Sequence, residues 1–459
     1  MWAVVVPLIL LFAIILVRRI PWIGGNIEAA LLISGLSMAL LAGLQPWQYV
    51  EATVDGLDRM AWVIALSFFG ALYAETQVRL GSINTTMDFL RKIFGNSPRG
   101  LIAATFITLV IGGSLLGDAI AAATVIGFLV IHSLAAMNIK PVQIGMIILV
   151  GASLGSIMPP VSQAIVMSTS LVGTDPIPVI RIAFLTVGFG VVLAILESFR
   201  FVRRRRAAEA ESDKPSGGAL APTPALGTLV RTRGYTLLPM LVLLSIVVLN
   251  AAWEIDVFAL VPGISHAVAA LAEVPVLSGL SNNIVLAIVV ATIVAFCFPS
   301  VHAKPLDTAA EGTRKVAQTI RLQVCAGVLI GMVYASGVVG TIAEVAQGMQ
   351  GEAITIGGIV ALIVIGMLTG SQTAAQTIVV PFLAPLLEQL GIPPFNIALG
   401  VSHIAAGGQN FPPVGLTAFV VSGLVGGTLN TKVDPVKVML LALPNSLYMC
   451  LVGAVALFI

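Results

Sequence analysis

The sequence predicts an all-α polytopic membrane protein built as an inverted repeat of two halves. Three observations predict this class. Hydrophobic residues make up 58% of the 459 residues, charged residues make up 10%, and the mean hydropathy is +1.05, whereas about a quarter of a soluble domain is charged. Apolar runs of membrane-spanning length recur along the whole chain. A pattern of glycine, three residues, two prolines and valine occurs twice, at 155–161 and 408–414.

The first half opens with three predicted spans, at about 2–17, 22–44 and 61–73. The loop after the first span is basic, and the loop after the second, with Glu51 and Asp55, is acidic. Lys and Arg gather in cytoplasmic loops, so the two loops lie on opposite sides and the N-terminus lies outside. No positive segment precedes the first apolar run, so a cleaved signal peptide is not expected.

The segment at about 100–136 is predicted to form a re-entrant helical hairpin, because basic residues at both of its ends, Arg99 and Lys140, put those ends on one side of the membrane. Its turn is expected within 112–118. A broken helix follows at about 142–171, where glycine and two prolines interrupt the backbone hydrogen bonds and leave carbonyls free. One further span returns the chain to the cytoplasm.

Residues 1–202 thus form the first repeat, and the second repeat, 234–459, follows the same plan. Its hairpin is expected at about 353–390 and its broken helix at about 396–425. Each half has five crossings, and an odd number inverts the second half and leaves both termini extracytoplasmic. The basic, Pro- and Ser-containing segment 203–233 is predicted to be a cytoplasmic linker. Its arginine run is interpreted as a topology anchor, so no nucleic-acid partner is expected.

Two segments of the second half carry opposite charge patterns. The insertion at about 251–283 holds three acidic residues and no Lys or Arg, so we expect it outside, at the membrane interface. The segment at about 302–321 is basic and is expected to be a cytoplasmic loop before a span at about 322–342.

An ungapped shift of 253 residues aligns the two halves. It pairs glycines and prolines at fixed offsets over more than fifty residues, including Gly117 with Gly370, and both prolines of the two breaks. Alanine and leucine matches carry little weight, because apolar segments match often by chance. The interpretation is a true internal repeat, and chance similarity of membrane segments is the alternative.

Each hairpin turn is predicted to face the broken helix of its own half and to form an all-oxygen site for Na⁺. Backbone carbonyls and hydroxyls are the ligands of small hard cations, and broken helices in transporters supply them. Inward-pointing helix N-termini would present partial positive charge to an anionic substrate. The candidate cation ligands are Gly112, Ser114, Gly117, Asp118, Gly155, Ser156 and Pro159 in the first half, and Thr369, Gly370, Thr373, Gly408 and Pro412 in the second.

Amide and hydroxyl groups are concentrated at the second hairpin and the second break. We predict that they contact the substrate as well as an ion. The substrate-binding candidates are Ser371, Gln372, Gln376, Gln409 and Asn410. No arginine lies at either break, so the sequence shows no guanidinium clamp for a carboxylate.

Three ionisable side chains in apolar context have two interpretations each. Asp118, which we expect at membrane depth, either ligates the cation or carries a proton, or it caps the second hairpin helix; one residue can do both. His132 and His403 are interpreted as packed, hydrogen-bonded histidines, with a proton relay as the alternative.

One motif is compatible with an enzyme. Residues 151–155 match the Gly-x-Ser-x-Gly elbow of serine hydrolases around Ser153, and His132 or His403 would have to serve as its base. That elbow requires a strand-to-helix turn, whereas both flanks here are predicted membrane helix. An intramembrane serine hydrolase and a passive pore stay as alternatives, but we expect no enzyme, and no cofactor besides Na⁺ as coupling ion.

The order of these motifs resembles the large membrane (DctM-like) subunit of TRAP transporters, within the wider ion-transporter superfamily. The resemblance rests on the first hairpin, the two breaks, a second hairpin with Pro381 and Pro385, and the segments 391–394 and 411–416. It extends from about residue 66 to 427, apart from the insertion. The chain departs from the family pattern at the first turn, where 112–114 is Gly-Gly-Ser, and before the second proline pair.

The resemblance implies a multi-pass secondary transporter of the cell inner (cytoplasmic) membrane. It implies sodium-coupled uptake of a small organic anion, such as a carboxylate, by an elevator mechanism. It also implies two partners, a small membrane subunit and an extracytoplasmic substrate-binding protein. A stand-alone ion-coupled carboxylate carrier without these partners is the alternative.

Overall fold

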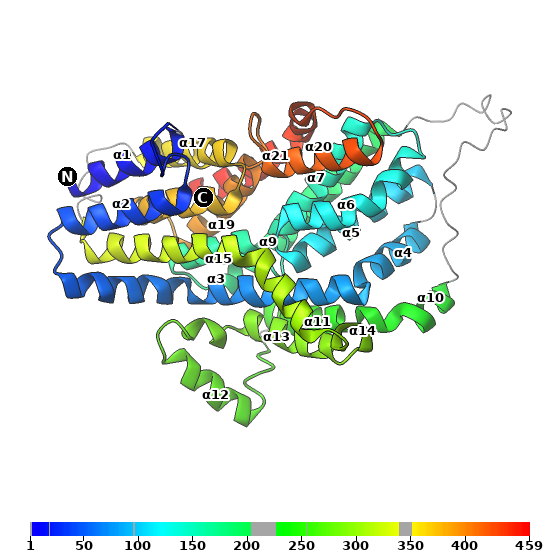
Figure 1. Cartoon of the computed structure of the whole chain (residues 1–459), viewed down its shortest axis with the longest axis horizontal. Helices are drawn as coiled ribbons and strands as arrows, with labels where there is room; N and C mark the ends of the chain where they lie inside the picture. The colour runs from blue at the N-terminus through cyan, green and yellow to red at the C-terminus, as the bar shows by residue number, and fades with distance from the viewer. Residues whose placement is uncertain (1, 18, 95–96, 203–225, 254, 339–350) are drawn as a thin grey trace.

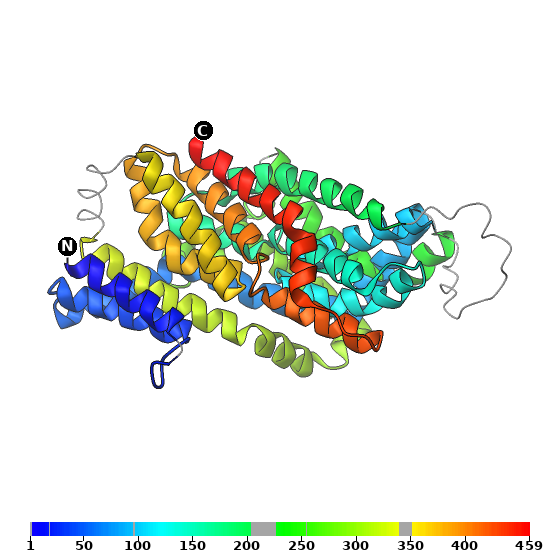
Figure 2. The same ribbon diagram turned by 90° about the horizontal axis from the view of Figure 1, so that it is seen from above.

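The computed structural model is an elongated helical bundle (Figures 1 and 2). It holds no strand within the residues that it describes, which are 2–17, 19–94, 97–202, 226–253, 255–338 and 351–459. Seven helices in this part of the chain are long and apolar enough to cross a membrane, by length and composition. The predicted class, an all-α polytopic membrane protein, is confirmed. The inversion of the halves stays a prediction.

Two long helices, α3 (Pro46–Leu80) and α15 (Pro305–Ala335), lie side by side along the long axis of the molecule (Figure 1). At 1.5 Å per residue they are about 50 and 45 Å long, well beyond the ~30 Å hydrocarbon core of a bilayer. Glycines let their backbones touch: a Cβ on Gly56 would overlap the carbonyl of Gly327, and a Cβ on Gly331 would overlap that of Ala52.

The predicted loops next to these two helices are wrong. Glu51 and Asp55 lie on the first turns of α3, and the basic segment at 305–321 is the first half of α15. Neither helix contains a proline after its first residue and the charges sit on exposed turns. Charge indicates which end of a helix meets water, but it does not stop the helix.

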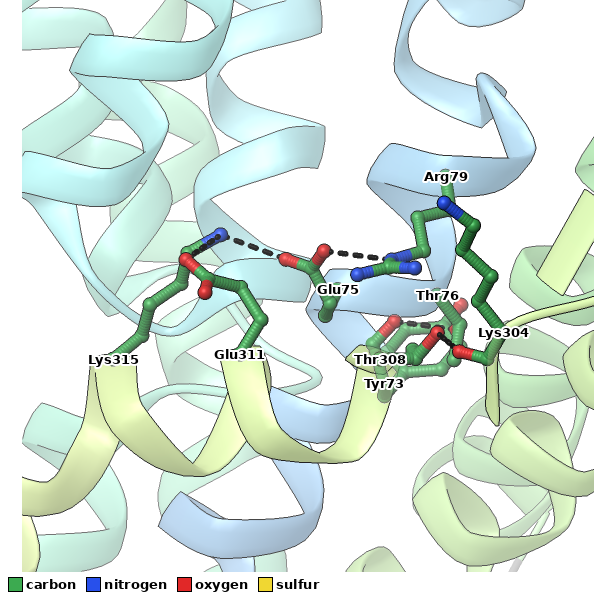
Figure 3. Close-up of polar contacts among 8 residues, drawn as sticks. All are labelled: Tyr73, Glu75, Thr76, Arg79, Lys304, Thr308, Glu311 and Lys315. Carbon is green, nitrogen blue, oxygen red and sulfur yellow. Dashed lines mark hydrogen bonds and ion pairs between the residues drawn. The ribbon is translucent and has the colours of Figure 1, made fainter. Parts of the chain in front are cut away.

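Figure 3 shows how the same two helices are joined at one end by charged side chains. The carboxylate of Glu75 on α3 is 7% exposed and accepts from Arg79, 3.0 Å away, and from Lys315 of α15, 2.7 Å away. Lys315 also lies 3.8 Å from Glu311. Nearer the middle, the Gln323 amide donates to the Ser67 hydroxyl at 2.6 Å. These contacts hold α3 and α15 together as one frame.

Two short helices cover the frame at the end where α3 begins and α15 ends. Helix α1 (Trp2–Leu16) pairs with α2 (Ile27–Leu41), and α2 packs on α15. The Ser34 hydroxyl of α2 donates to the carbonyl of Pro7 in α1 at 3.0 Å, so a buried polar group is satisfied where the two helices meet.

The rest of the first half continues from α3 through an amphipathic helix into five further α-helices and a short 3-10 helix. Its elements are α4 (Ser82–Phe94), α5 (Pro98–Leu116), α6 (Ala119–Ala135), α7 (Pro141–Ile157), α8 (Gln163–Val172), α9 (Pro176–Ser198) and η1 (Phe199–Phe201). Proline stands at the first position of several of these helices, where its missing N–H costs no helical bond.

The second half contains frame helix α15, which follows α14 in the chain. Its other elements are α10 (Leu226–Arg233), η3 (Gly234–Leu237), α11 (Leu238–Trp253), α12 (Pro262–Ala272), η4 (Ser278–Ser281), α13 (Asn283–Phe296), α14 (Pro299–His302), α17 (Gly351–Thr369), α18 (Gln372–Gln389), α19 (Pro394–Gly408), α20 (Leu416–Thr428) and α21 (Pro435–Phe458). The predicted linker falls outside the described residues up to 225, and its last part is α10.

The insertion after α11 is anchored on the frame. Asp58 of α3 accepts from the Val276 N–H at 2.8 Å and from the Ser278 hydroxyl at 2.6 Å. Gly279 lies so close to α3 that a Cβ there would overlap the backbone at Ala61. Helix α12 itself buries no residue and stands apart from the bundle at the lower edge of Figure 1.

Candidate functional site

The first hairpin meets the first break through its turn. Helices α5 and α6 join at Gly117, whose φ of 66° is the left-handed conformation that glycine adopts readily. The Ser114 hydroxyl donates to the carbonyl of Pro159 at 2.8 Å. A Cβ on Gly117 would lie 3.3 Å from the Val161 carbonyl oxygen. Asp118 is exposed and accepts from the Ala121 N–H at 2.7 Å, so it caps α6.

The second hairpin meets the second break in the same way. Its turn residue Gly370 has a φ of 63°, and a Cβ there would lie 2.7 Å from the Val414 carbonyl oxygen. Ser371 caps α18, because its hydroxyl accepts from the Ala374 N–H at 3.3 Å. Each of these positions lies 253 residues after its counterpart at the first turn. The shift found in the sequence therefore also aligns the contacts.

Glycine contacts between hairpin and broken helix follow the same shift. A Cβ on Gly113 of α5 would lie 2.7 Å from the Cα of Gly155 in α7, and a Cβ on Gly366 of α17 would lie 3.0 Å from the carbonyl carbon of Gly408 in α19. Both proline pairs, 159–160 and 412–413, contain a cis peptide bond. In both halves the hairpin thus lies directly on the backbone that leads into the break.

The proline pairs leave one carbonyl free at corresponding places. Residue 160 and residue 413 are prolines without an N–H, so the carbonyls four residues earlier, of Ser156 and Gln409, have no main-chain donor among the described residues. Both residues are buried, at 0% and 5% exposure. A buried carbonyl without a donor needs another partner, and a small hard cation is one that suits it.

Side chains of each half reach the break of the other half. The Ser153 hydroxyl of α7 donates to the Asn410 side-chain oxygen at 3.2 Å. The Gln372 side-chain amide of the second hairpin donates to the Ser156 hydroxyl at 3.1 Å. The Gln372 main-chain N–H donates to the Gln409 side-chain oxygen at 3.3 Å, and the Gln409 side-chain amide donates to the Gln372 side-chain oxygen at 3.4 Å. All these residues are buried. The two breaks therefore belong to one polar centre.

Sequence reasoning missed Ser153 as a member of this centre, although it lies one helical turn before Ser156. The hydrolase alternative had assigned it a histidine partner, but its partner is Asn410. His403 instead contacts Thr186 Oγ1 at 2.8 Å and the Leu399 carbonyl at 2.9 Å, which confirms a packed, hydrogen-bonded histidine. His132 is exposed on α6, so the same interpretation is wrong for it.

The other predicted ligands lie at the edges of the breaks or within helices. The Thr369 hydroxyl donates to the Ile365 carbonyl of its own helix at 2.7 Å, and Gly112 packs against α6 inside the first hairpin. Gln376 is fully buried, and neither of its amide atoms has a partner among the described residues. The remaining three are buried or half-buried next to their own break or turn: Thr373, Gly408 and Pro412.

The polar atoms at this centre belong to uncharged groups, namely hydroxyls, side-chain amides and backbone carbonyls. Within the described residues no group of three or more His, Cys, Asp or Glu side chains is placed to hold a metal ion. Uncharged oxygens of this kind are the ligands that small hard cations prefer.

The two breaks differ in how they are covered. Every residue of α8 is buried, and its Ser170 hydroxyl donates to the carbonyl of Arg59 in frame helix α3. Helix α20, the counterpart of α8, exposes Phe419 by 47%, and Gly423, the counterpart of Ser170, has open space around it. Over the described residues α20 makes no extended contact with frame helix α15. Among the described residues, the first broken helix is docked on the frame and the second makes no extended contact with it in this conformation.

Comparison with known proteins agrees with this architecture. A family model described as "Tripartite ATP-independent periplasmic transporter, DctM component" matches residues 8–459. A solved structure, the YdaH transporter of Alcanivorax borkumensis, whose description reports an unusual topology, superimposes with a TM-score of 0.61 at 16% identity. The alignment covers 98% of this chain and 97% of that chain. At this identity the likeness concerns the fold alone. No curated protein matches the sequence.

Proposed function

Because the chain belongs to the family of DctM components of tripartite ATP-independent periplasmic transporters, we propose that it couples Na⁺ entry to the uptake of a small organic anion. It is a membrane-embedded transporter component and not an enzyme. Members of this family work with a small membrane subunit and a substrate-binding protein, and we propose the same two partners here.

The doubled break carries the proposal. Two buried carbonyls, of Ser156 and Gln409, lose their helical donors at corresponding places, and the side chains of Gln372 and Asn410 bond to hydroxyls of the first broken helix. In the proposal each break, with its hairpin turn, binds one Na⁺. The amides of Gln372 and Asn410 lie between the two sites and bind the anion together with the N-terminal ends of α6 and α18.

Binding of ²²Na⁺ to the purified chain tests the cation sites. Pro160→Ala returns an N–H four residues after Ser156 and removes the proline that keeps α7 from continuing past Ile157; once the helix extends, this N–H bonds the freed carbonyl and removes it as a ligand. We expect ²²Na⁺ affinity to fall by about tenfold or more, since even outer-shell changes at metal sites cost about that much. Pro141→Ala, at the first position of α7, is the matched control and should bind as the wild type does.

Two results would contradict sodium coupling. One is a wild-type chain that binds no ²²Na⁺. The other is uptake of radiolabelled carboxylates into proteoliposomes, with both partner proteins present, that is equal in Na⁺ and choline buffers.

The unequal covering of α8 and α20 supports transport by alternating docking on the frame. In the proposed second conformation α20 lies against α15 as α8 lies against α3. Ser170 contacts Met60 in the present conformation. Adding 253 to both numbers gives Gly423 and Thr313, which should therefore be neighbours in the second conformation. Gly423 and Thr313 are both exposed here.

Disulfide trapping tests this second conformation in a background without Cys297, Cys325 and Cys450. The pair Gly423→Cys with Thr313→Cys should cross-link in reconstituted protein, in proportion to the population of that conformation. The pair Ser170→Cys with Met60→Cys is the control for the conformation described above. If only the control pair ever cross-links, whatever the Na⁺ concentration, alternating docking is wrong.

A further inference from the structure

Helices α4 and α10 lie at the end of the molecule opposite the N-terminus (Figure 1). They carry an exposed surface that plays no part in the proposed transport. We define the α4–α10 surface by its exposed residues, which combine positive charge with large apolar side chains. They are Lys92, Ile93 and Phe94 of α4, and Leu226, Val230 and Arg231 of α10.

Side-chain contacts fix α4 against η3 and α10, which follow each other in the chain. The Ser82 hydroxyl donates to the Thr236 carbonyl at 2.6 Å, and the Thr236 hydroxyl donates to Thr85 at 2.9 Å. Further along, Arg233 pairs with Asp88 at 3.2 Å. Residue numbers along α4 increase from one contact to the next, while those of their partners decrease from 236 to 233. The two segments therefore run antiparallel, and the residues near 230 lie beside those near 92. The surface is therefore one continuous patch.

The charges of this patch have no ion-pair partner in the described part of the chain. Lys92 and Arg231 are exposed and make no ion pair with any described residue. The Nε atom of the neighbouring Arg91 is buried without a hydrogen-bond partner in the same part of the chain. Ile93 is 58% and Val230 53% exposed. Unpaired cations next to exposed apolar side chains are typical of helices that lie in a membrane interface.

We infer that the α4–α10 surface binds the headgroups of anionic phospholipids. Phosphate accepts from Lys and Arg, while Ile93, Phe94 and Val230 enter the boundary between headgroups and acyl chains. A lipid fits better than an acidic protein, because apolar helices of spanning character continue from both sides of the patch: α5 begins at Pro98 and α11 at Leu238. These helices hold the patch at the depth of the headgroups.

Native mass spectrometry of the full chain, purified in detergent and titrated with phosphatidylglycerol or phosphatidylcholine, tests this inference. Wild-type protein should retain phosphatidylglycerol in preference to phosphatidylcholine. The double substitution Lys92→Gln with Arg231→Gln should weaken phosphatidylglycerol binding on the order of 30-fold, from two headgroup-contacting cations.

The matched control removes two charges elsewhere. Lys432 and Lys437 are also exposed and make no ion pair with a described residue, so Lys432→Gln with Lys437→Gln changes the net charge equally. This control should keep wild-type lipid binding. Equal losses in the two variants, or no preference for phosphatidylglycerol in the wild type, would overturn the inference. Size-exclusion profiles verify that both variants are folded.

Discussion

A methyl group added at Gly113 should separate the first hairpin from the first break. The Cβ of Gly113→Ala would lie 2.7 Å from the Cα of Gly155, which is backbone and cannot rotate away. Ordinary carbon contacts begin at about 3.5 Å, so α5 and α7 must move apart by roughly 0.8 Å. Overpacking of this kind costs about 1–3 kcal/mol, and the better helix propensity of alanine offsets up to about 1 kcal/mol.

Two further glycines make the prediction graded. Gly366→Ala places its Cβ 3.0 Å from the carbonyl carbon of Gly408, so a smaller movement of roughly 0.5 Å suffices. Gly188→Ala on α9 meets nothing within 4 Å and only gains helix propensity. We therefore expect melting temperatures to rank Gly188→Ala highest, Gly366→Ala next and Gly113→Ala lowest.

Thermal unfolding by intrinsic fluorescence, with and without Na⁺, measures this ranking. Because the hairpin turn is part of the proposed first cation site, the stabilisation by Na⁺ should shrink most in Gly113→Ala. A Gly113→Ala protein as stable as Gly188→Ala, with the same response to Na⁺, would refute the close packing of hairpin and break on which this reasoning depends.

Two other substitutions test contacts outside the hairpins. Glu75→Gln removes the carboxylate that joins Arg79 to Lys315. Since Lys315 is 51% exposed, we expect the free energy of unfolding to fall by about 1–2 kcal/mol, less than for a fully buried pair. Thermal unfolding measures this loss, and Glu311→Gln is the control that should be neutral. Asn410→Ala leaves the buried Ser153 hydroxyl without its acceptor and should lower the free energy of unfolding by about 1–2 kcal/mol. It should also weaken anion uptake more than Ser153→Ala does. Equal uptake in the two variants would exclude Asn410 from substrate binding.

Long helices show where sequence reasoning failed. Loop charge predicted a boundary near residue 60 and another near residue 321, yet α3 and α15 run through both. A charged turn is compatible with helix as long as it meets water. What favours the continuous helices is their mutual packing through Gly56, Gly327 and Gly331, a contact between segments about 270 residues apart that no local pattern reveals.

The sequence by itself determined the membrane class, the family and the position of the two breaks. These follow from composition and from proline and glycine, whose backbone chemistry acts on the residues next to them. Only the tertiary structure decided which side chains complete the centre. Ser153 with Asn410, and Ser156 with Gln372, pair residues from opposite halves, and such pairing depends on how the halves pack. The docking of α8, but not α20, on the frame is likewise a property of the packed conformation.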